Sequence, residues 1–235
     1  MNPKTKSSID VVVFAPHPDD GELGAGGLLA KLRAREMRAA IVDLTQGELG
    51  TKGDPETRAK EATAAAQILE LHERICLDLG DGQVADTPEQ RREVVSVLRI
   101  LRPRLVLTTW AGDEHPDHRA AFHLVRSAFF MARLSKFETG QGMHAAEQLW
   151  TYGIHHEDPA SFVVDISAEF EQKVQALRCY VSQFVHAELP EGYRYAATSN
   201  YLEQVELRGR FWGGKIGAAY GEAFAPVTPL RVDHF

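Results

Sequence analysis

The sequence predicts a single α/β domain of the Rossmann-like, doubly wound type, with a mostly parallel sheet and helices on both faces. Short apolar runs alternate with amphipathic stretches from Asp10 to about Arg133, which is the rhythm of right-handed βαβ units. The length of 235 residues and the apolar content of 44% are enough for one large core. We find no repeat, low-complexity tract or linker, so we expect one domain over residues 1–235.

The elements follow from this alternation in chain order. The run DVVVFA at 10–15 is almost entirely apolar, as expected for a parallel strand covered on both faces. Strands are predicted at 10–15, 39–44, 74–79, 104–109, 149–154 and 162–166. Helices are predicted at 22–37, 57–71, 88–101, 116–133 and 167–187, with an exposed polar loop at 135–147 and a partly helical tail at 199–224.

Composition excludes several classes of partner. The net charge of −7 leaves no basic stripe for phosphates, which argues against a nucleic-acid partner. No window approaches the roughly 20 apolar residues of a membrane helix, so no membrane partner is expected. The N-terminal stretch MNPKTKSSID has no apolar leader segment. We therefore expect a cytoplasmic protein.

The loop after the first strand is rich in polar groups. It reads Pro16-His17-Pro18-Asp19-Asp20-Gly21-Glu22, with one imidazole and three carboxylates within six positions. Ligands bind at the carboxyl ends of strands in open α/β sheets, and a cation would offset the repulsion between these carboxylates. The alternative is a polar cap on the following helix, for which one such residue is enough.

A dinucleotide site is the other possibility for this loop, because Gly24-Ala25-Gly26-Gly27 follows the strand and Asp43 ends the next one. The third glycine of the G-x-G-x-x-G pattern would fall at position 29, which is Leu29. The acidic run also stands where a pyrophosphate would approach. We reject the nucleotide interpretation.

A second cluster, Asp113-Glu114-His115-Pro116-Asp117-His118, follows the fourth predicted strand. A histidine here could alone be a surface helix cap. Pro116 suits the first helical position, which puts His118 in the first turn, where the helix dipole favours a neutral imidazole. Together the two loops supply two histidines and one carboxylate, the ligands of a catalytic zinc site with an open position.

These residues suggest a hydrolytic mechanism. His17, Asp20 and His118 are the expected metal ligands, and neighbouring Asp19 is the candidate general base toward a water. His115 could stabilise an oxyanion or protonate a leaving amine, and Asp117 could orient an imidazole. Zinc is the first choice of metal, but Fe²⁺, Co²⁺ or Mn²⁺ would also suit these ligands.

The motifs APHPDDGELGAGG and, about a hundred residues later, HPDH resemble the PIG-L/LmbE-like superfamily of zinc-dependent N-acetylglucosaminyl deacetylases. The stretches DLTQGELGTKGDPETRAKEA, LDLGDG and RGRFWGGKIGAAYGEAF look like its bacillithiol-biosynthesis branch, and this likeness spans nearly the whole chain. The resemblance implies removal of acetyl from N-acetylglucosaminyl-malate. It implies the same metal ligands, Asp19 as base, and His115 as transition-state stabiliser paired with Asp117.

The resemblance also implies substrate contacts and an assembly. Arg58 would contact the substrate, since malate carboxylates need a bidentate donor, and Glu61 could hold Arg58 in place; otherwise both are ordinary surface charges. Tyr201 could reach the site from the tail. A homo-oligomer, hexameric in this branch, is expected by analogy. One departure stands out: Glu114 occupies the position where the branch has arginine before HPDH.

Two other functions remain possible from the sequence. One is a deacetylase that acts on another small N-acetyl amino-sugar substrate, such as a disaccharide or an antibiotic precursor. The other is a noncatalytic metal- or sugar-binding protein on the same fold. Asp19 and His115 argue against the second, because binding alone needs no general base.

Overall fold

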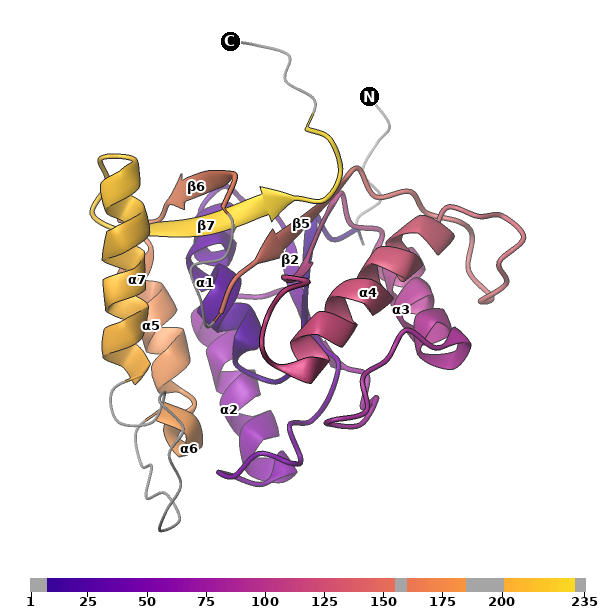
Figure 1. The fold of residues 1–235 in the computed structure, drawn as a ribbon, viewed down its shortest axis with the longest axis horizontal. Coiled ribbons are helices and arrows are strands. Elements are labelled where there is room, and N and C mark those ends of the chain that lie inside the picture. Colours follow the sequence, from indigo (N-terminus) through magenta and orange to yellow (C-terminus); the bar gives the residue numbers. More distant parts are fainter. Residues whose placement is uncertain (1–7, 155–159, 185–200, 231–235) are drawn as a thin grey trace.

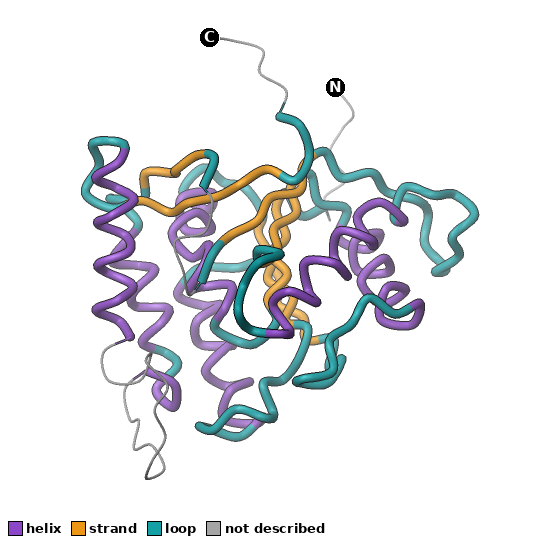
Figure 2. The backbone as a smooth tube through the Cα atoms, viewed as in Figure 1, coloured by secondary structure: helices purple, strands orange, loops and turns teal. Residues whose placement is uncertain are grey.

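The computed structural model describes residues 8–154, 160–184 and 201–230. A seven-stranded sheet forms its centre, in the order β3-β2-β1-β4-β5-β7-β6. Figure 1 shows α1, α2, α5 and α7 on one side of the sheet and α3 and α4 on the other, and Figure 2 shows the strands between these layers. The predicted doubly wound, mostly parallel α/β fold is confirmed.

Strands β1 to β5 are mutually parallel, and β7 is the strand that runs opposite to its neighbours. The bounds are β1 Val11–Ala15, β2 Ala39–Asp43, β3 Glu73–Cys76, β4 Leu105–Thr109, β5 Gln148–Tyr152, β6 Phe162–Asp165 and β7 Gly221–Pro226. Strand β1 pairs in parallel with β2 and β4, and β4 pairs in parallel with β5. Strand β7 runs antiparallel between β5 and β6.

The helices follow the strands in the expected order. Their bounds are α1 Asp20–Arg33, α2 Pro55–Ile68, α3 Pro88–Leu101, α4 Pro116–Met131, α5 Phe170–Arg178, α6 Val181–Phe184 and α7 Tyr201–Lys215. Three of them begin with proline at the first helical position, directly after a side chain that accepts a backbone N–H. Asp54 caps α2, Thr87 caps α3 and His115 caps α4. These caps fix where each loop ends.

Two hydrophobic cores lie on the two faces of the sheet. Successive side chains of a strand point to opposite faces, so β1 contributes to both. Val11 and Val13 pack into the core beneath α1, α2 and α5, whereas Val12 and Phe14 pack into the core beneath α3 and α4. Because both faces are covered, the central strands are apolar throughout, which is the pattern that predicted them.

The C-terminal third differs from the prediction. The tail forms α7 and then strand β7, which the sequence pattern did not indicate. The residues of β7, GEAFAP, have little intrinsic strand preference, and the strand forms because β5 and β6 flank it on both sides. The single long helix expected at 167–187 is two helices, α5 and α6. The last residues of that prediction, 185–187, and residues 199–200 of the predicted tail lie outside the described residues.

The order of the strands positions the candidate site. Strands β1 and β4 are neighbours and parallel, so the loops that follow them meet at one edge of the sheet. The loop after β3 opens at the same edge, since β3 is parallel to β2 and β2 to β1. Within residues 8–154, 160–184 and 201–230, no helix has both the length and the apolar character needed to cross a membrane.

The close packing of α1 on β5 can be tested at Gly24 of α1. A Cβ atom at Gly24 would overlap with the ring of Tyr152, a fully buried residue whose hydroxyl donates to the Phe14 carbonyl at 2.8 Å. We expect Gly24→Ala to lower the free energy of unfolding by about 1–3 kcal/mol or more, as overpacking does. Urea denaturation monitored by circular dichroism measures this.

Gly214→Ala is the matched control for Gly24→Ala. Gly214 also lies in a helix, α7, but among the described residues no atom outside the backbone and immediate neighbours of Gly214 in that helix stands within 4 Å of the position that its Cβ would take. Alanine is the better helix former, so this variant should be unchanged or stabilised by up to about 1 kcal/mol. Equal stabilities of the two variants would contradict the close packing of α1 on β5.

Candidate metal and active site

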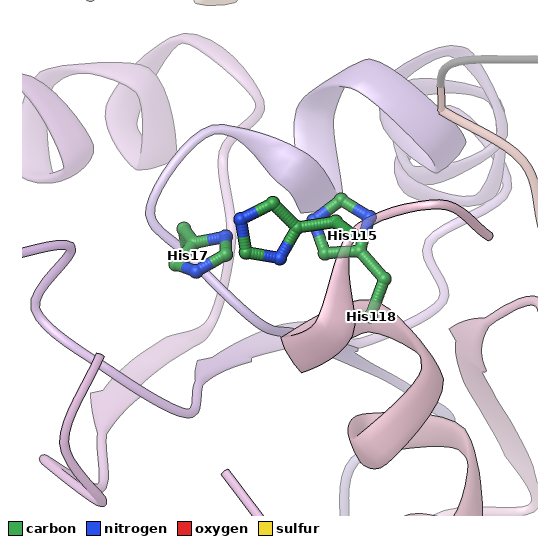
Figure 3. Close-up of side chains that lie close together, drawn as sticks. All are labelled: His17, His115 and His118. Carbon is green, nitrogen blue, oxygen red and sulfur yellow. The ribbon is translucent and has the colours of Figure 1, made fainter. Parts of the chain in front are cut away.

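Three histidines meet at the carboxyl edge of the sheet. His17 comes from the loop between β1 and α1, His115 caps α4, and His118 lies in the first turn of α4. Their ring centroids are 4.8 Å apart for His17 and His115, 4.7 Å for His115 and His118, and 5.5 Å for His17 and His118. Figure 3 shows the three rings side by side, His17 from the loop before α1 and His115 and His118 from the start of α4.

Asp20 stands between two of these rings. Its Oδ2 atom is 3.1 Å from His17 Nδ1 and 3.2 Å from His118 Nε2. The backbone N–H of His17 also donates to this oxygen at 3.0 Å. All three residues are buried. One oxygen and two imidazole nitrogens therefore converge on a single point.

The far nitrogen of each of these two rings faces a carboxylate. His17 Nε2 is 3.1 Å from Asp81 Oδ1 and 3.3 Å from Asp117 Oδ2. His118 Nδ1 is 3.0 Å from Asp113 Oδ2. A histidine that binds a metal typically donates its other N–H to a carboxylate, which fixes the tautomer and turns the ring toward the ion. Both rings have this arrangement around Asp20.

His115 is held differently. Its Nδ1 accepts the backbone N–H of Asp117 at 3.2 Å, and its own backbone N–H donates to Asp113 Oδ1 at 2.8 Å. A neutral imidazole that accepts at Nδ1 carries its proton on Nε2. The ring is therefore a hydrogen-bond donor at Nε2, the atom opposite its cap contact.

The expected pairing of His115 with Asp117 runs through the Asp117 backbone. The Asp117 carboxylate lies against His17 and also accepts the backbone N–H of Gly82 at 2.7 Å. Asp81, in the same loop as Gly82, accepts the backbone N–H of Leu49 at 2.9 Å through its Oδ2. The two carboxylates that orient His17 are thus tied to the loops after β2 and β3.

Asp19 is buried beside the ligand Asp20 and has an uncommon backbone conformation. Its φ angle is 115°, a positive value that non-glycine residues adopt rarely and at a cost in free energy. Its Oδ2 atom lies 3.4 Å from a guanidinium nitrogen of Arg58. The same guanidinium donates to the carbonyls of Pro18 at 2.6 Å and Gly47 at 3.2 Å. Arg58 therefore stabilises the loop between β1 and α1, in which Asp19 has this strained conformation.

The three residues expected to contact substrate lie in different surroundings. Arg58 is only 4% exposed, and its two terminal guanidinium nitrogens donate to carbonyls of the chain. Both carboxylate oxygens of Glu61 accept hydrogen bonds from Ser182, at 2.7 Å each, so Glu61 anchors α6. Tyr201 stacks on Phe184, with ring centroids 5.3 Å apart. The geometry thus gives each of the three a contact within the protein.

Burial and charge shift the pKa values of the cluster. Burial opposes the charged forms of His118 and Asp20, but their mutual attraction outweighs it. The pKa of His118 is raised to about 9, and that of Asp20 is held well below its usual range. Burial likewise opposes protonation of His17, yet the carboxylates of Asp117, Asp20 and Asp81 raise its pKa. Two imidazolium groups therefore balance the acidic cluster.

The pKa values of Asp19 and His115 shift in the directions opposite to those of Asp20 and His118. Burial raises the pKa of Asp19 to about 7, against the attraction of Arg58. Burial lowers the pKa of His115, and the charges of His118 and His17 lower it further. A carboxylate with a pKa near 7 is suited to accept a proton from water. A neutral imidazole is suited to donate a hydrogen bond to an oxyanion.

The donor set fits a divalent metal. The ligand atoms of His17, His115 and His118 lie within 4.8 Å of one another, as do those of His17, Asp81 and Asp117. Asp20 Oδ2 lies closer still to His17 and His118, and the carboxylates beyond both rings favour these two as ligands. Two nitrogens and one carboxylate oxygen suit zinc and other first-row divalent metals.

Sequence reasoning missed Asp81 and gave no role to Asp113. Asp81 follows β3 in the stretch LDLGDG, the carboxyl end of a parallel strand. That position was the available signal, because the carboxyl ends of neighbouring parallel strands share one edge. Its contact with His17 could not be predicted from local sequence, because the two residues lie 64 positions apart in the chain.

Comparisons with known proteins agree with the geometry. The family model PIG-L, described as GlcNAc-PI de-N-acetylase, matches residues 12–129. The chain is 32% identical to the diacetylchitobiose deacetylase of Thermococcus kodakarensis, over 96% of this chain and 86% of that one. It is 28% identical to the "probable N-acetyl-alpha-D-glucosaminyl L-malate deacetylase 2" of Bacillus anthracis, over 88% of this chain and 96% of that one.

The fold also matches a solved structure along almost its whole length. The conserved protein TT1542 from Thermus thermophilus is 40% identical, with a TM-score of 0.86 over 97% of each chain. The family model covers β1 through most of α4, which is the segment that contains all three histidines. The chain therefore belongs to the PIG-L family of GlcNAc-PI de-N-acetylase-like proteins, and it is a hydrolase of the N-deacetylase type.

Proposed function

We propose that the protein hydrolyses the N-acetyl group of an N-acetylglucosamine conjugate, using zinc held by His17, Asp20 and His118. The observation that carries this proposal is the convergence of His17 Nδ1 and His118 Nε2 on Asp20 Oδ2, each ring with a carboxylate at its far nitrogen. A site that only bound sugar would not need a buried Asp19 beside these ligands. When bound, zinc supplies a Lewis acid that polarises the amide carbonyl and acidifies the attacking water.

Asp19 is the general base in this proposal. It takes a proton from the water as the water oxygen attacks the acetyl carbon, and the proton then passes to the departing amine nitrogen. Its burial supports this role, because the raised pKa makes the carboxylate a better proton acceptor than an exposed aspartate. Arg58 holds the base in place through its contacts with Asp19 and the Pro18 carbonyl.

His115 stabilises the tetrahedral intermediate. Its Nδ1 is occupied by the Asp117 N–H, so its Nε2–H can donate to the oxygen that gains negative charge. The lowered pKa keeps the ring neutral, and the fixed cap geometry means that the donor is oriented before substrate arrives. Asp117 and Asp81 orient His17, and Asp113 orients His118.

The substrate is an N-acetylglucosamine conjugate, and two observations favour an uncharged partner sugar over malate. Glu114 is exposed directly before His115, where an acidic side chain would repel malate carboxylates. Arg58, the donor expected for those carboxylates, is turned inward onto carbonyls of the chain. The 32% identity to a diacetylchitobiose deacetylase also supports a disaccharide substrate. N-acetylglucosaminyl-malate is the second candidate.

Three sequence expectations stay predictions. They are the single domain over residues 1–235, the cytoplasmic location and the homo-oligomer, hexameric by family analogy.

The decisive experiment measures acetate release by the zinc-loaded protein. Substrates are N,N'-diacetylchitobiose, N-acetylglucosaminyl-malate and free N-acetylglucosamine. We expect release from the conjugates, fastest with diacetylchitobiose, because no carboxylate then faces Glu114. Faster release from the malate conjugate would instead support the bacillithiol branch. Absence of release from all three would contradict the proposed function.

Asp19→Asn is the variant that tests the base in the same assay. We expect kcat/KM to fall about 100- to 10,000-fold while zinc is retained, because the amide cannot accept the proton. Asp86→Asn is the control, since Asp86 is an exposed aspartate paired with Arg91. Turnover of Asp19→Asn close to that of the control would exclude Asp19 as base.

Asp81→Ala tests the carboxylates that orient the metal ligands. Loss of the contact to His17 Nε2 should weaken zinc binding about 10-fold or more, within the range seen when such partners are removed. Competition with a chromophoric chelator gives the dissociation constant. Asp86→Ala, in the same loop, should bind zinc like the unmodified protein. Unchanged affinity in Asp81→Ala would mean that Asp117 alone orients His17.

Zinc affinity should depend on pH in a defined direction. With a pKa of about 9, His118 is protonated at neutral pH in the metal-free protein, and the ring must lose this proton to bind zinc. The pKa of the other ligand histidine, His17, is also raised, so both rings lose a proton on binding. The apparent affinity should therefore rise with pH up to about 9, by roughly tenfold per pH unit for each proton released. Chelator competition at several pH values checks this. An affinity that is constant or falls with pH would contradict the assignment of His118 as a ligand.

A further inference from the structure

A buried ion pair contacts the backbone of the helix that carries Asp20. Lys173 of α5 and Glu222 of β7 lie 2.6 Å apart and are only 3% and 4% exposed. Lys173 Nζ donates to the Leu23 carbonyl at 2.8 Å. Glu222 Oε1 accepts the backbone N–H of Gly27 at 2.8 Å. The two charged side chains thus connect two backbone groups of α1.

Leu23 and Gly27 are the partners of one regular helical hydrogen bond. In an α-helix the N–H of a residue donates to the carbonyl four residues before it. Here a closed chain of contacts runs from the Leu23 carbonyl through Lys173 and Glu222 to the Gly27 N–H. The ion pair therefore binds both polar groups of one turn of α1.

Further contacts join this ion pair to α1. Glu222 Oε2 accepts the next N–H along, from Leu28, at 2.7 Å, so both of its oxygens bind α1. A guanidinium nitrogen of Arg208 lies 3.4 Å from the Leu23 carbonyl. The glycine-rich stretch gives the pair access to the backbone, since a Cβ at Gly26 would stand 3.2 Å from Lys173 Cγ.

The backbone groups that the ion pair binds lie next to the turn that forms the site. The N–H of Leu23 donates to the Asp19 carbonyl at 2.9 Å, which closes the first turn of α1 over Asp19 and Asp20. The carbonyl of the same Leu23 is the group that Lys173 binds. A buried ion pair is costly to desolvate and is weak evidence for stability by itself. A geometric role would explain why two charges are buried here.

We propose that Lys173 and Glu222 are positioning residues for the metal site. By binding the Leu23 carbonyl and the Gly27 N–H, they set the direction of the first turn of α1 and so the place of Asp20 Oδ2 between His17 and His118. This inference rests on the proposed function in one respect, the assignment of Asp20 as a metal ligand. Both residues lie beyond residues 12–129, the segment that the family model matches.

The test measures zinc affinity in the full-length protein by chelator competition, together with thermal unfolding of the metal-free protein. The variants are Lys173→Met and Glu222→Gln, which keep size and remove charge, and the exchange Lys173→Glu with Glu222→Lys. Lys31→Met is the matched control, because Lys31 lies on the same helix and pairs with Glu169 of the segment before α5. Asp20→Asn is the reference for loss of a ligand.

We expect the zinc dissociation constant to rise at least tenfold in both single variants and to stay within threefold in Lys31→Met. The exchange should not restore affinity, because an ammonium group would then face the Gly27 N–H. Folded single variants with affinity within threefold of the unmodified protein, or restoration by the exchange, would overturn the proposal. If Lys173→Met does not fold, Glu222→Gln decides by the same criterion.

The outcomes separate this proposal from the proposed function. Zinc affinity is measured without substrate, so a protein that binds zinc through Asp20 yet releases no acetate would contradict the deacetylase proposal alone. Unchanged zinc affinity in Asp20→Asn would instead overturn the ligand assignment, and with it both proposals.

Discussion

The attraction between Asp20 and the two imidazoles beside it is the interaction on which the site depends. Five aspartates at this edge of the sheet are buried: Asp19, Asp20, Asp81, Asp113 and Asp117. So many carboxylates can stay together out of water only if positive charge balances them. In the metal-free protein the protons on His17 and His118 and the Arg58 guanidinium supply that charge. A divalent cation can take the place of the protons, because the ring nitrogens already point at Asp20 Oδ2.

A second charged network, centred on Arg74, fixes the start of α1 against the sheet. Arg74 of β3 binds both oxygens of Asp43 at the end of β2, at 2.7 and 2.9 Å, and Glu22 of α1 at 2.5 Å. Tyr180 donates to the same oxygen of Glu22 at 2.9 Å. Asp43, which a dinucleotide site would use for a ribose, is instead the partner of Arg74. The network joins α1 to two strands, so the start of α1 is fixed on one side by Arg74 and farther along by Lys173 and Glu222.

The fold brings these groups together but does not by itself decide the reaction. Doubly wound sheets support many chemistries, and function depends on the side chains at the carboxyl edge. Here the informative contrast is between neighbouring aspartates. Asp20 has its pKa lowered by His118 and His17 against the effect of burial, whereas burial raises the pKa of Asp19. Two adjacent carboxylates are thereby suited to different tasks, one to remain charged and one to accept a proton.

The order of amino acids was enough to predict the five parallel strands, the helices between them and the meeting of HPDD with HPDH. It could do so because these features depend on local periodicity and on the rule that parallel strands share a carboxyl edge. Three features appear only in the folded chain. Strand β7 lies between β5 and β6, Asp81 and Asp117 face His17, and Lys173 and Glu222 bind the backbone of α1. These contacts could not be predicted because they join residues up to 195 positions apart, and no local pattern of apolar or polar residues encodes which distant groups will pair.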